Sequence, residues 1–410
     1  MGEPPRSALN HIFATQDYPP VGGGMSRRYV ELCRRFGDGA GETTTMEVST
    51  VSAGDGGAFD AGENYPIYRQ SFSFDEANRF GNQLRWGYWL NRHCRRRIDV
   101  IHCGNIRPLG YAVTWPHFRL GLPYLMYVNG GDLLREKLKS EQGVKRAGAR
   151  QMLGGAAGIV ATSKWVAELA GEVMDKLGIR SVPPVGAFDL GTDPVKFHPT
   201  RDTGSLRARW GTGDAPLLIT VARLVPHKGQ DSAIRALALL SDEFPELRYV
   251  MVGEGHYEPQ LRDLARELGV ADRTVFAGLL TDDDLPEAYA TSTLYVGLSR
   301  VDRVVNVEGF GISFLEAAAS GIPAVAGDSG GVRSAVRDGE TGLVVRATDI
   351  GSIAAAIALL IREEPLRLAM GRAARLAVET HYNWARVARD TRDFTYAVAG
   401  KRSSKWSSKR

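Results

Sequence analysis

The stretch Leu294-Tyr-Val-Gly-Leu298 and, beyond a loop, Glu308-Gly-Phe-Gly-Ile-Ser-Phe-Leu-Glu316 have the pattern of a buried strand that leads into a helix. The strand residues are apolar or small, as in a strand that is covered on both faces. A helix is expected from Ile312 to Ser320, because Gly321 and Pro323 end it there. A strand, a loop and a helix in this order are typical of parallel α/β sheets.

Two carboxylates enclose the junction between this loop and this helix. Glu308 precedes the helix and Glu316 lies inside it, so both can accept hydrogen bonds from hydroxyl groups. Gly309 and Gly311 allow the backbone to approach a ligand closely, and the amides of a helix start suit phosphate or sugar oxygens. We interpret the stretch as a clamp for a sugar nucleotide. The alternative is a surface loop followed by one acidic helix residue, because two glutamates at this spacing are weak evidence alone.

Length and composition limit the classes of protein to which this chain can belong. The 410 residues are too many for one core, so two domains are expected. Hydrophobic residues make up 43% and charged residues 24%, which is ordinary for a globular protein. No apolar run reaches the roughly 18 residues that a membrane span needs. A net charge of +4 argues against nucleic acid as a main partner.

The cysteines and the start of the chain bear on its compartment. Cys33, Cys94 and Cys103 are odd in number and lack metal-ligand spacing, which favours free thiols in a reducing compartment and argues against zinc. The start Met1–Pro5 does not resemble a secretory signal. We therefore expect a cytoplasmic protein.

Apolar runs alternate with helical patterns along the chain, which predicts an α/β fold with two three-layer α/β/α domains. The hinge between them is expected in the proline-rich and polar segment Asp193–Asp214, and the tail Lys401–Arg410 is expected to be disordered. Ser26–Arg35 is predicted as a helix whose first residue can cap it. The predicted strands are His11–Thr15, Val100–Cys103, Tyr124–Val128, Gly158–Ala161, Leu217–Val221, Tyr249–Val252, Val275–Ala277, Leu294–Leu298 and Ala324–Ala326.

Loops that follow parallel strands are the expected place for a ligand. After Leu217–Val221, Arg223 and Lys228 flank a proline turn and can grip a diphosphate, the first as a fork and the second as a point charge. By itself such a pair is more often solvated. Gly253-Glu-Gly255 is a tight loop that can lie beside a nucleotide, and Gly327-Asp-Ser-Gly-Gly331 is another glycine loop that enters a helix.

Four of these elements, in this order and spacing, resemble the donor-binding domain of the GT-B glycosyltransferases of family four, a retaining group. They are Ala222–Gln230, Val252–Gly255, Glu308–Glu316 and Ala326–Gly331, with Asp338–Leu343 behind them. The sequence Val307-Glu-Gly-Phe-Gly311, preceded by the insertion Arg300–Asn306, is similar to that of the phosphatidylinositol-type mannosyltransferases of that family. Asp17–Met25 resembles the family's glycine loop near the donor phosphates and the acceptor, and Leu190–Pro199 resembles its exit from the first domain.

The resemblance implies a GT-B fold, in which two Rossmann-like domains face each other across a cleft. Residues 1–200 would bind the acceptor, with a helix at about 382–400 crossing back, and residues 201–381 would bind the donor. Arg223 and Lys228 would neutralise the leaving diphosphate. The other implied donor contacts are Glu308 at the sugar, Glu316 at the ribose, backbone around Gly309, Phe310, Gly311 and Ile312, and Gly23, Gly24 and Gly253 at close approaches.

Neither a metal nor another cofactor is needed on this reading, because two fixed cations carry the diphosphate charge. Asp282-Asp-Asp284 is better explained as the acidic start of a helix toward Ala290 than as a metal motif. The family is thought to react on one face of the donor sugar, with the leaving phosphate helping to deprotonate the acceptor.

One departure from the family concerns a histidine that often follows the strand corresponding to Tyr124–Val128. Here that run is Asn129-Gly-Gly-Asp132, and an asparagine cannot titrate near neutral pH. Asn129, Asp132, Tyr18 and His102 are candidate contacts of the sugar or the acceptor, although a buried structural histidine is the better explanation of His102.

The acceptor side is less well defined. Phe80–Arg97 places aromatic residues beside an arginine cluster, which suits a helix on an anionic membrane or an amphipathic helix packed on its own sheet with a basic end. A second basic stretch, with Arg135, Lys137, Lys139, Lys145 and Arg146, can recognise a phosphorylated acceptor or be solvated.

We expect a retaining glycosyltransferase, cytoplasmic or peripheral to the membrane, that moves a hexosyl group from a UDP- or GDP-hexose to a hydroxyl of a small molecule, glycan or glycolipid. One alternative is a non-catalytic GT-B protein that binds a nucleotide sugar or glycan. Another alternative is a GT-B phosphorylase or a nucleotide-sugar epimerase. A phosphorylase uses no nucleotide sugar, so Glu316 would have no ribose to bind in it.

Overall fold

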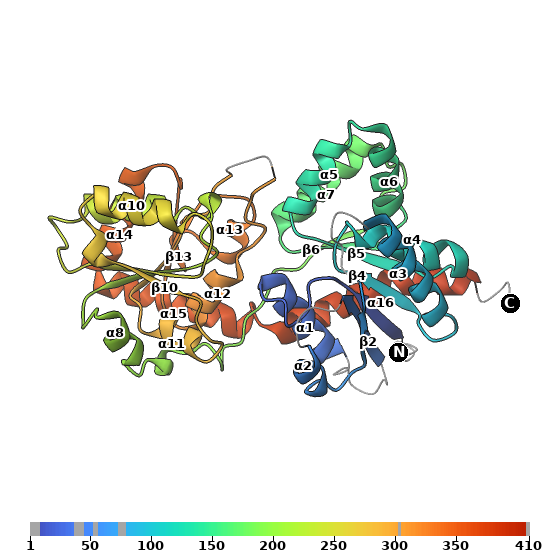
Figure 1. The fold of residues 1–410 in the computed structure, drawn as a ribbon, viewed down its shortest axis with the longest axis horizontal. Coiled ribbons are helices and arrows are strands. Elements are labelled where there is room, and N and C mark those ends of the chain that lie inside the picture. The colour runs from blue at the N-terminus through green and yellow to red at the C-terminus, as the bar shows by residue number, and fades with distance from the viewer. Residues whose placement is uncertain (1–8, 37–44, 52–55, 73–78, 302–304, 407–410) are drawn as a thin grey trace, which may run out of the picture. The chain divides into compact units, whose positions relative to one another are not determined.

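The computed structural model describes residues 9–36, 45–51, 56–72, 79–301 and 305–406, which form two compact units (Figure 1). The first unit comprises Met1–Phe188 and Trp384–Arg410, and the second comprises Asp189–Asn383. The chain therefore passes from one unit to the other twice. Of the Arg300–Asn306 insertion, residues 302–304 lie outside the described residues.

The structure divides the chain between Phe188 and Asp189, whereas the expected boundary lies at residue 200 and the expected hinge at Asp193–Asp214. Thr192 N donates to Tyr382 O at 2.9 Å inside the second unit, so the chain has already entered that unit there. The polar segment is folded and not a linker, because the Glu287 carboxylate accepts hydrogen bonds from Thr203, Ser205 and the Leu206 amide.

The first unit is built on a parallel sheet whose strand order among the described residues is β3-β2-β1-β4-β5-β6-β7. Its central strands are buried on both faces, which explains their continuous apolar sequences. The strands are β1 (Asn10–Ala14), β2 (Thr45–Val51), β3 (Ile67–Gln70), β4 (Val100–Cys103), β5 (Tyr124–Val128), β6 (Gly158–Ala161) and β7 (Val185–Ala187).

Helices surround this sheet (Figure 1). The Ser163 hydroxyl accepts from Val166 N at the start of α7, and Gly178 ends that helix with a φ of 69°. The last helix, α16, packs on α1 and brings Phe394 and Tyr396 against β6 and β1. The helices are α1 (Gly24–Phe36), α2 (Gly57–Ala61), α3 (Arg79–His93), α4 (Leu109–Leu120), α5 (Gly131–Lys139), α6 (Gly143–Gly154), α7 (Lys164–Leu177) and α16 (Trp384–Trp406).

The second unit repeats the plan with the strand order β10-β9-β8-β11-β12-β13, again parallel. Its strands are β8 (Leu217–Val221), β9 (Arg248–Val252), β10 (Thr274–Gly278), β11 (Leu294–Gly297), β12 (Ala324–Gly327) and β13 (Gly342–Val345). Its α-helices are α8 (Ser205–Trp210), α9 (Gln230–Leu239), α10 (Glu258–Glu267), α11 (Asp284–Ala290), α12 (Ile312–Ala319), α13 (Val332–Ala335), α14 (Ile350–Arg362) and α15 (Glu364–Thr380), and its 3₁₀ turns are η2 (Pro199–Arg201), η3 (Pro226–Lys228) and η4 (Ala271–Arg273).

Each sheet has one point at which the chain reverses its direction of strand addition. In the first unit this switch point lies between β1 and β4, and in the second it lies between β8 and β11. Loops at the carboxyl ends of such strand pairs diverge and leave room for a ligand. These loops position the candidate site in each unit.

The sequence predicts no membrane-spanning segment and a disordered C-terminal tail. No helix in the described part of the chain is long and apolar enough to cross a bilayer. The tail Lys401–Arg410, expected to be disordered, is helical as far as Trp406, where α16 ends, and residues 407–410 lie outside the described ranges.

Candidate active site

The loops after β8 and β11 meet at the switch point of the second unit through Lys228 and Glu308. Lys228 Nζ lies 2.6 Å from Glu308 Oε2, and both side chains are largely buried. Lys228 ends η3, where Gly229 turns the chain into α9 with a φ of 75°. A Cβ atom on Gly229 would lie 2.1 Å from Leu298 O, so only glycine lets these two loops approach this closely.

The electrostatics of this pair favour two charged partners. Burial alone would raise the pKa of the Glu308 carboxyl, but the Lys228 charge and the hydrogen bonds from Lys228 and Ser299 outweigh burial and lower it below its ordinary value. Lys228 and Ser299 both bind Oε2, and no described residue hydrogen-bonds to Oε1. One carboxylate oxygen therefore holds the lysine in place while the other can meet a ligand hydroxyl.

Arg223 lies in the same loop as Lys228. Its side chain is exposed, and its carbonyl oxygen accepts from Gln230 Nε2 at 3.0 Å, which ties the loop to the start of α9. The guanidinium makes no ion pair within the described residues. Arg300 braces the opposite loop by pairing with Asp231 at 3.0 Å. The loop carries two cations at the switch point, one fixed by a carboxylate and one exposed.

Glu316 lies on α12 with 4% of its surface exposed. Its Oε2 atom accepts the Tyr289 hydroxyl proton at 2.7 Å. Tyr289 comes from α11, and sequence reasoning missed it because its partner is distant along the chain. A ribose would reach Glu316 only at the small exposed part of the carboxylate.

The start of α12 presents backbone more than side chains. Phe310 is 2% exposed and Ile312 is 9% exposed, so contacts with a ligand there would be made by their amides. Gly311 has a φ of 96°, and a Cβ atom on it would lie 2.6 Å from the Phe314 ring. Gly309 directly precedes this turn.

Gly253 has a reason to be glycine that is internal to the protein. Its φ is 131°, and an added Cβ atom would lie 2.1 Å from Ala222 O. The residue therefore brings the loop after β9 against the loop that carries Arg223. This contact explains the glycine without a ligand.

In the first unit, Asn129 and Asp132 lie together after β5, where Gly130 has a φ of 78°. Asp132 Oδ1 accepts from Asn129 N at 2.9 Å and from Leu133 N at 2.8 Å. Burial raises the pKa of Asp132 to about 6, against these backbone hydrogen bonds. Asp132 thus folds the loop, and Asn129 remains half-buried at its edge.

Tyr18 is not exposed to a substrate, which corrects the expectation for that residue, whereas His102 is buried, as the favoured explanation of a structural histidine predicts. Tyr18 is 1% exposed and its hydroxyl lies 2.6 Å from that of Tyr65. His102 is fully buried between His11 and Tyr127, at 2.9 Å from each. The strand that carries His102 is covered on both faces, so its side chain has no path to a ligand.

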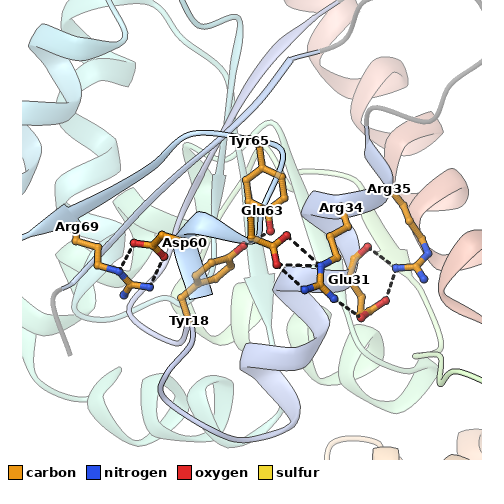
Figure 2. A network of polar contacts seen from close by, with 8 residues as sticks. All are labelled: Tyr18, Glu31, Arg34, Arg35, Asp60, Glu63, Tyr65 and Arg69. Carbon is orange, nitrogen blue, oxygen red and sulfur yellow. Dashed lines mark hydrogen bonds and ion pairs between the residues drawn. The ribbon is translucent and has the colours of Figure 1, made fainter. Parts of the chain in front are cut away.

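The glycine loop that precedes α1 is held in place by side chains of β3 and α2. Figure 2 shows Arg69 of β3 gripping Asp60 of α2 with two hydrogen bonds of 2.7 Å. The same guanidinium donates to Pro19 O at 2.7 Å. Gly23, with a φ of 129°, and Gly24 lie at the exposed end of this loop. The polar network drawn there consists of Tyr18, Glu31, Arg34, Arg35, Asp60, Glu63, Tyr65 and Arg69.

Asp17 is a site residue that the sequence did not single out. It follows β1, and its Oδ2 atom accepts from Asn105 Nδ2, after β4, at 3.1 Å. The two residues bridge the switch point of the first unit. Burial raises the pKa of Asp17, and the hydrogen bond from Asn105 opposes that rise. The position of Asp17 in the loop that follows β1 was the signal that could have revealed it.

Asp284 begins α11, as expected for the acidic run. Asp282 and Asp284 pair with Lys196 and Arg209, respectively. Within the described residues, no cluster of three or more histidine, cysteine or acidic side chains could hold a metal ion.

One surface of the first unit combines packing with exposed apolar groups. On α3, Trp86 and Leu90 are fully buried, and Trp86 Nε1 donates to Ser49 of β2 at 2.9 Å. The helix is therefore packed on its own sheet. Its outer side carries Phe80, Leu84 and Tyr88, which are 74%, 46% and 56% exposed.

Two doubly wound units, the second with cations and carboxylates at its switch point, define the class of two-domain α/β proteins with the GT-B fold. Solved structures share this fold. The Anabaena protein HepE in complex with UDP-glucose matches with a TM-score of 0.76 and 18% identity over 95% of this chain and 100% of that one. Sucrose-phosphate synthase from Thermosynechococcus elongatus matches with a TM-score of 0.76 and 17% identity over 96% and 100%.

Sequence comparisons identify the family. Residues 22–180 match the model described as Glycosyltransferase Family 4, and residues 203–377 match Glycosyl transferases group 1. A D-inositol 3-phosphate glycosyltransferase of Thermobispora bispora is 30% identical over 71% of this chain and 69% of its own. The chain belongs to the family-four glycosyltransferases.

A GDP-mannose-dependent alpha-(1-6)-phosphatidylinositol monomannoside mannosyltransferase of Mycolicibacterium smegmatis is 39% identical over 47% of this chain. The matching part spans 51% of that relative, so the chain covers about half the length of this mannosyltransferase.

Proposed function

We propose that this protein is a retaining glycosyltransferase that moves a hexosyl group from a nucleotide-diphosphate sugar to an acceptor hydroxyl. The observation that carries the proposal is the Lys228–Glu308 pair at 2.6 Å, which places a fixed cation beside a carboxylate at the switch point of the second unit. Such a site binds an anionic leaving group and a hydroxylated sugar side by side.

Lys228 and Arg223 would stabilise the diphosphate as it leaves. Bond breaking leaves negative charge on the diphosphate, and a cation that is already oriented needs no reorganisation to meet it. Glu308 orients Lys228 through one oxygen, which leaves two of the three ammonium protons for phosphate oxygens. With two cations in one loop, the reaction would need neither a metal ion nor another cofactor.

The other proposed contacts with the donor are assigned from where the residues lie around the switch point of the second unit. Glu308 Oε1 would accept a hydroxyl of the sugar, and the amides from Gly309 to Ile312 at the start of α12 would bind its outer hydroxyls and the diphosphate. Glu316, held by Tyr289, would accept ribose hydroxyls. Gly253 would keep its loop beside the nucleotide. The acceptor would attack on the face that the diphosphate leaves, and a phosphate oxygen would take its proton.

The first unit would supply the acceptor side. Asp17, held by Asn105, offers a carboxylate to an acceptor hydroxyl at the switch point of that unit. Asn129 would hydrogen-bond to the donor sugar or the acceptor. Gly23 and Gly24 would allow close approach of the backbone.

The names of the similar proteins suggest which donor and acceptor to test first. The mycobacterial and inositol-phosphate relatives are named for GDP-mannose, phosphatidylinositol mannoside and D-inositol 3-phosphate. GDP-mannose is therefore the donor that we propose first, and an inositol-containing glycolipid the acceptor.

A lipid acceptor requires access to a membrane surface. Phe80, Leu84 and Tyr88 share one side of α3, and the exposed Arg85 and Arg92 lie beside them. Apolar side chains inserted at the interface, with arginines at anionic headgroups, would hold the protein peripherally on a bilayer.

The non-catalytic alternative predicts binding without turnover. Asn129 in place of a titratable group is the observation that favours it, whereas the presence of Arg223, Lys228, Glu308 and Glu316 together argues for transfer.

The test is incubation of the purified chain with a panel of UDP- and GDP-hexoses in EDTA, with thermal shift and donor hydrolysis measured for each. We expect selective stabilisation and slow hydrolysis, both lost in Lys228→Ala. Addition of phosphatidylinositol or its mannosides should then give a product whose mass increases by one hexosyl unit. Binding without hydrolysis or transfer supports the scaffold, and no response to any nucleotide sugar overturns the proposal.

A further inference from the structure

Arg28 on α1 is a fully buried arginine without an ion pair among the described residues. Burial lowers the pKa of its guanidinium, and the nearby Tyr29, Tyr127 and Asp132 groups oppose that effect. A buried cation is costly unless it is paired or fully hydrogen-bonded. A hydrophobic side chain of similar length would fill the space at lower cost, so the fold alone does not account for Arg28.

The contacts of Arg28 converge on one side chain of the candidate site. Arg28 Nη1 donates to Asn129 Oδ1 at 3.3 Å, and the guanidinium carbon lies 5.0 Å from the centre of the Tyr127 ring. Arg28 Nε and Nη2 are buried and find no hydrogen-bond partner in the described part of the chain. Among the described residues, Asn129 is thus the one side chain that hydrogen-bonds to Arg28.

Asn129 is held through both its side chain and its backbone. Its oxygen faces the Arg28 donor, and its backbone nitrogen donates to Asp132 at 2.9 Å. Burial raises the pKa of the neighbouring Tyr29 hydroxyl, and the Arg28 charge opposes that rise. The Tyr29 hydroxyl itself donates to Gly104 O. These contacts allow one orientation of the amide, with oxygen toward Arg28 and nitrogen away from it.

We propose that Arg28 is a positioning residue that locks Asn129 so that the site presents an N–H donor to the oxygen of a bound sugar or acceptor. This rests on the proposed function, in which Asn129 touches the substrate. The ligand group is an oxygen acceptor, a hydroxyl or a phosphate oxygen. Asn129 then needs no titration, because its donor is present at every pH at which the fold is stable.

Two substitutions of Arg28, one of them made in two backgrounds, test the link between Arg28 and Asn129. Arg28→Met keeps the length and volume of the stem but removes the donor, so the melting temperature should hold or rise while turnover of the donor sugar falls about tenfold. In an Asn129→Ala background the same change should cause no further loss, because the two residues act as one unit. Arg28→Lys restores a donor and should recover part of the turnover.

Asn129→Asp provides a matched isostere. It replaces the N–H donor by an oxygen and gives Arg28 a carboxylate partner, so the melting temperature should rise while turnover is lost. A structural role alone cannot produce these opposite changes. A crystal structure of Arg28→Met should show the Asn129 amide rotated from its wild-type orientation, whether or not the protein is active.

The outcomes separate this inference from the proposed function. Equal losses on Arg28→Met in both backgrounds, an unmoved Asn129 amide, or a lower melting temperature for Asn129→Asp each overturn the role of Arg28. If the wild type turns over no nucleotide sugar, the proposed function fails, and the amide orientation in Arg28→Met with the Asn129→Asp melting temperature still decides the inference.

Discussion

Lys228 and Glu308 are held 2.6 Å apart although they belong to loops after different strands. The contact crosses the switch point of the second sheet and sets the distance between the cation and the carboxylate before any ligand arrives. The site is therefore organised by the protein itself, as electrostatic stabilisation of a leaving group requires.

Lys228→Met should reduce transfer by about a hundredfold to a thousandfold, because it removes an oriented cation from the leaving group. It should also cost about 1–3 kcal/mol of stability, since Glu308 loses its partner in a largely buried site. With the lysine gone, the pKa of Glu308 rises, and the cost should shrink at acidic pH as the carboxyl protonates. Single-turnover kinetics and urea unfolding would measure both effects. Lys176→Met, which breaks the exposed pair with Glu141, is the control and should leave activity unchanged.

Tyr289→Phe should weaken nucleotide binding about tenfold and cost about 1–2 kcal/mol of stability, because it removes the hydrogen bond that orients Glu316. Calorimetric titration with GDP and UDP would give the affinity. Tyr295→Phe removes a similarly buried hydroxyl, which donates to Ser313 at 2.7 Å, and should lower stability without changing affinity. Equal effects on binding in the two variants would count against a role of Glu316 at the ribose.

Gly253→Ala should destabilise the second unit more than Gly269→Ala. Both positions have positive φ, 131° and 68°, but an added Cβ atom meets Ala222 O at 2.1 Å only at Gly253, whereas Gly269 faces open space. Strain alone costs about 1 kcal/mol, and the steric clash adds to it. Unfolding by urea would show the difference, and equal costs would contradict the close approach of the two loops.

Acidification should destabilise the first unit through its buried histidines. Burial lowers the pKa of His11 from 6.5 to about 3 and, with His11 nearby, lowers that of His102 well below its ordinary value. The unfolded chain therefore binds protons that the folded chain does not, and stability falls as the pH drops from 6.5 toward 3, by up to about 1.4 kcal/mol per pH unit for each histidine. A His11→Leu and His102→Leu double variant should show a shallower loss in urea titrations at pH 7, 6, 5 and 4, whereas exposed His256→Leu should not.

The outer side of α3 should be needed for membrane binding and not for folding. Replacing Leu84 and Tyr88 by serine removes apolar surface that would enter the bilayer, so partition onto vesicles containing phosphatidylinositol should fall at least about tenfold. Stability should change by less than about 0.5 kcal/mol per site, because both side chains are exposed. Leu239→Ser, on an exposed residue of the second unit, is the control for sedimentation with vesicles. Unchanged binding by the double variant would rule out this surface.

The central strands were predictable because burial on both faces leaves a continuous apolar run. The bounds of β4, β5, β6 and β8 agree with those expected from sequence. β2, β3, β7 and β13 were not predicted. Most of them lie at or near a sheet edge, where half-exposed strands admit polar residues such as those of Thr45–Val51 and lose the apolar signal.

Candidate site residues were predictable where a local sequence pattern marks them. Lys228 lies in a proline turn after β8 and Glu308 begins a glycine-rich run before α12, whereas the contact between Asp17 and Asn105 joins residues 88 positions apart. Tyr18 was misjudged for a related reason. A polar side chain next to a glycine loop does not reveal whether it faces the solvent or the core, and Tyr18 faces the core.

The position of α16 has a consequence for biosynthesis. The second unit is one continuous segment, Asp189–Asn383, whereas the first is closed by residues from Trp384 onward that pack on α1. During translation, domains normally fold in the order in which they leave the ribosome. Here the unit that emerges first must wait for the last helix, so the unit encoded in the middle of the gene can complete its fold before the one at the start.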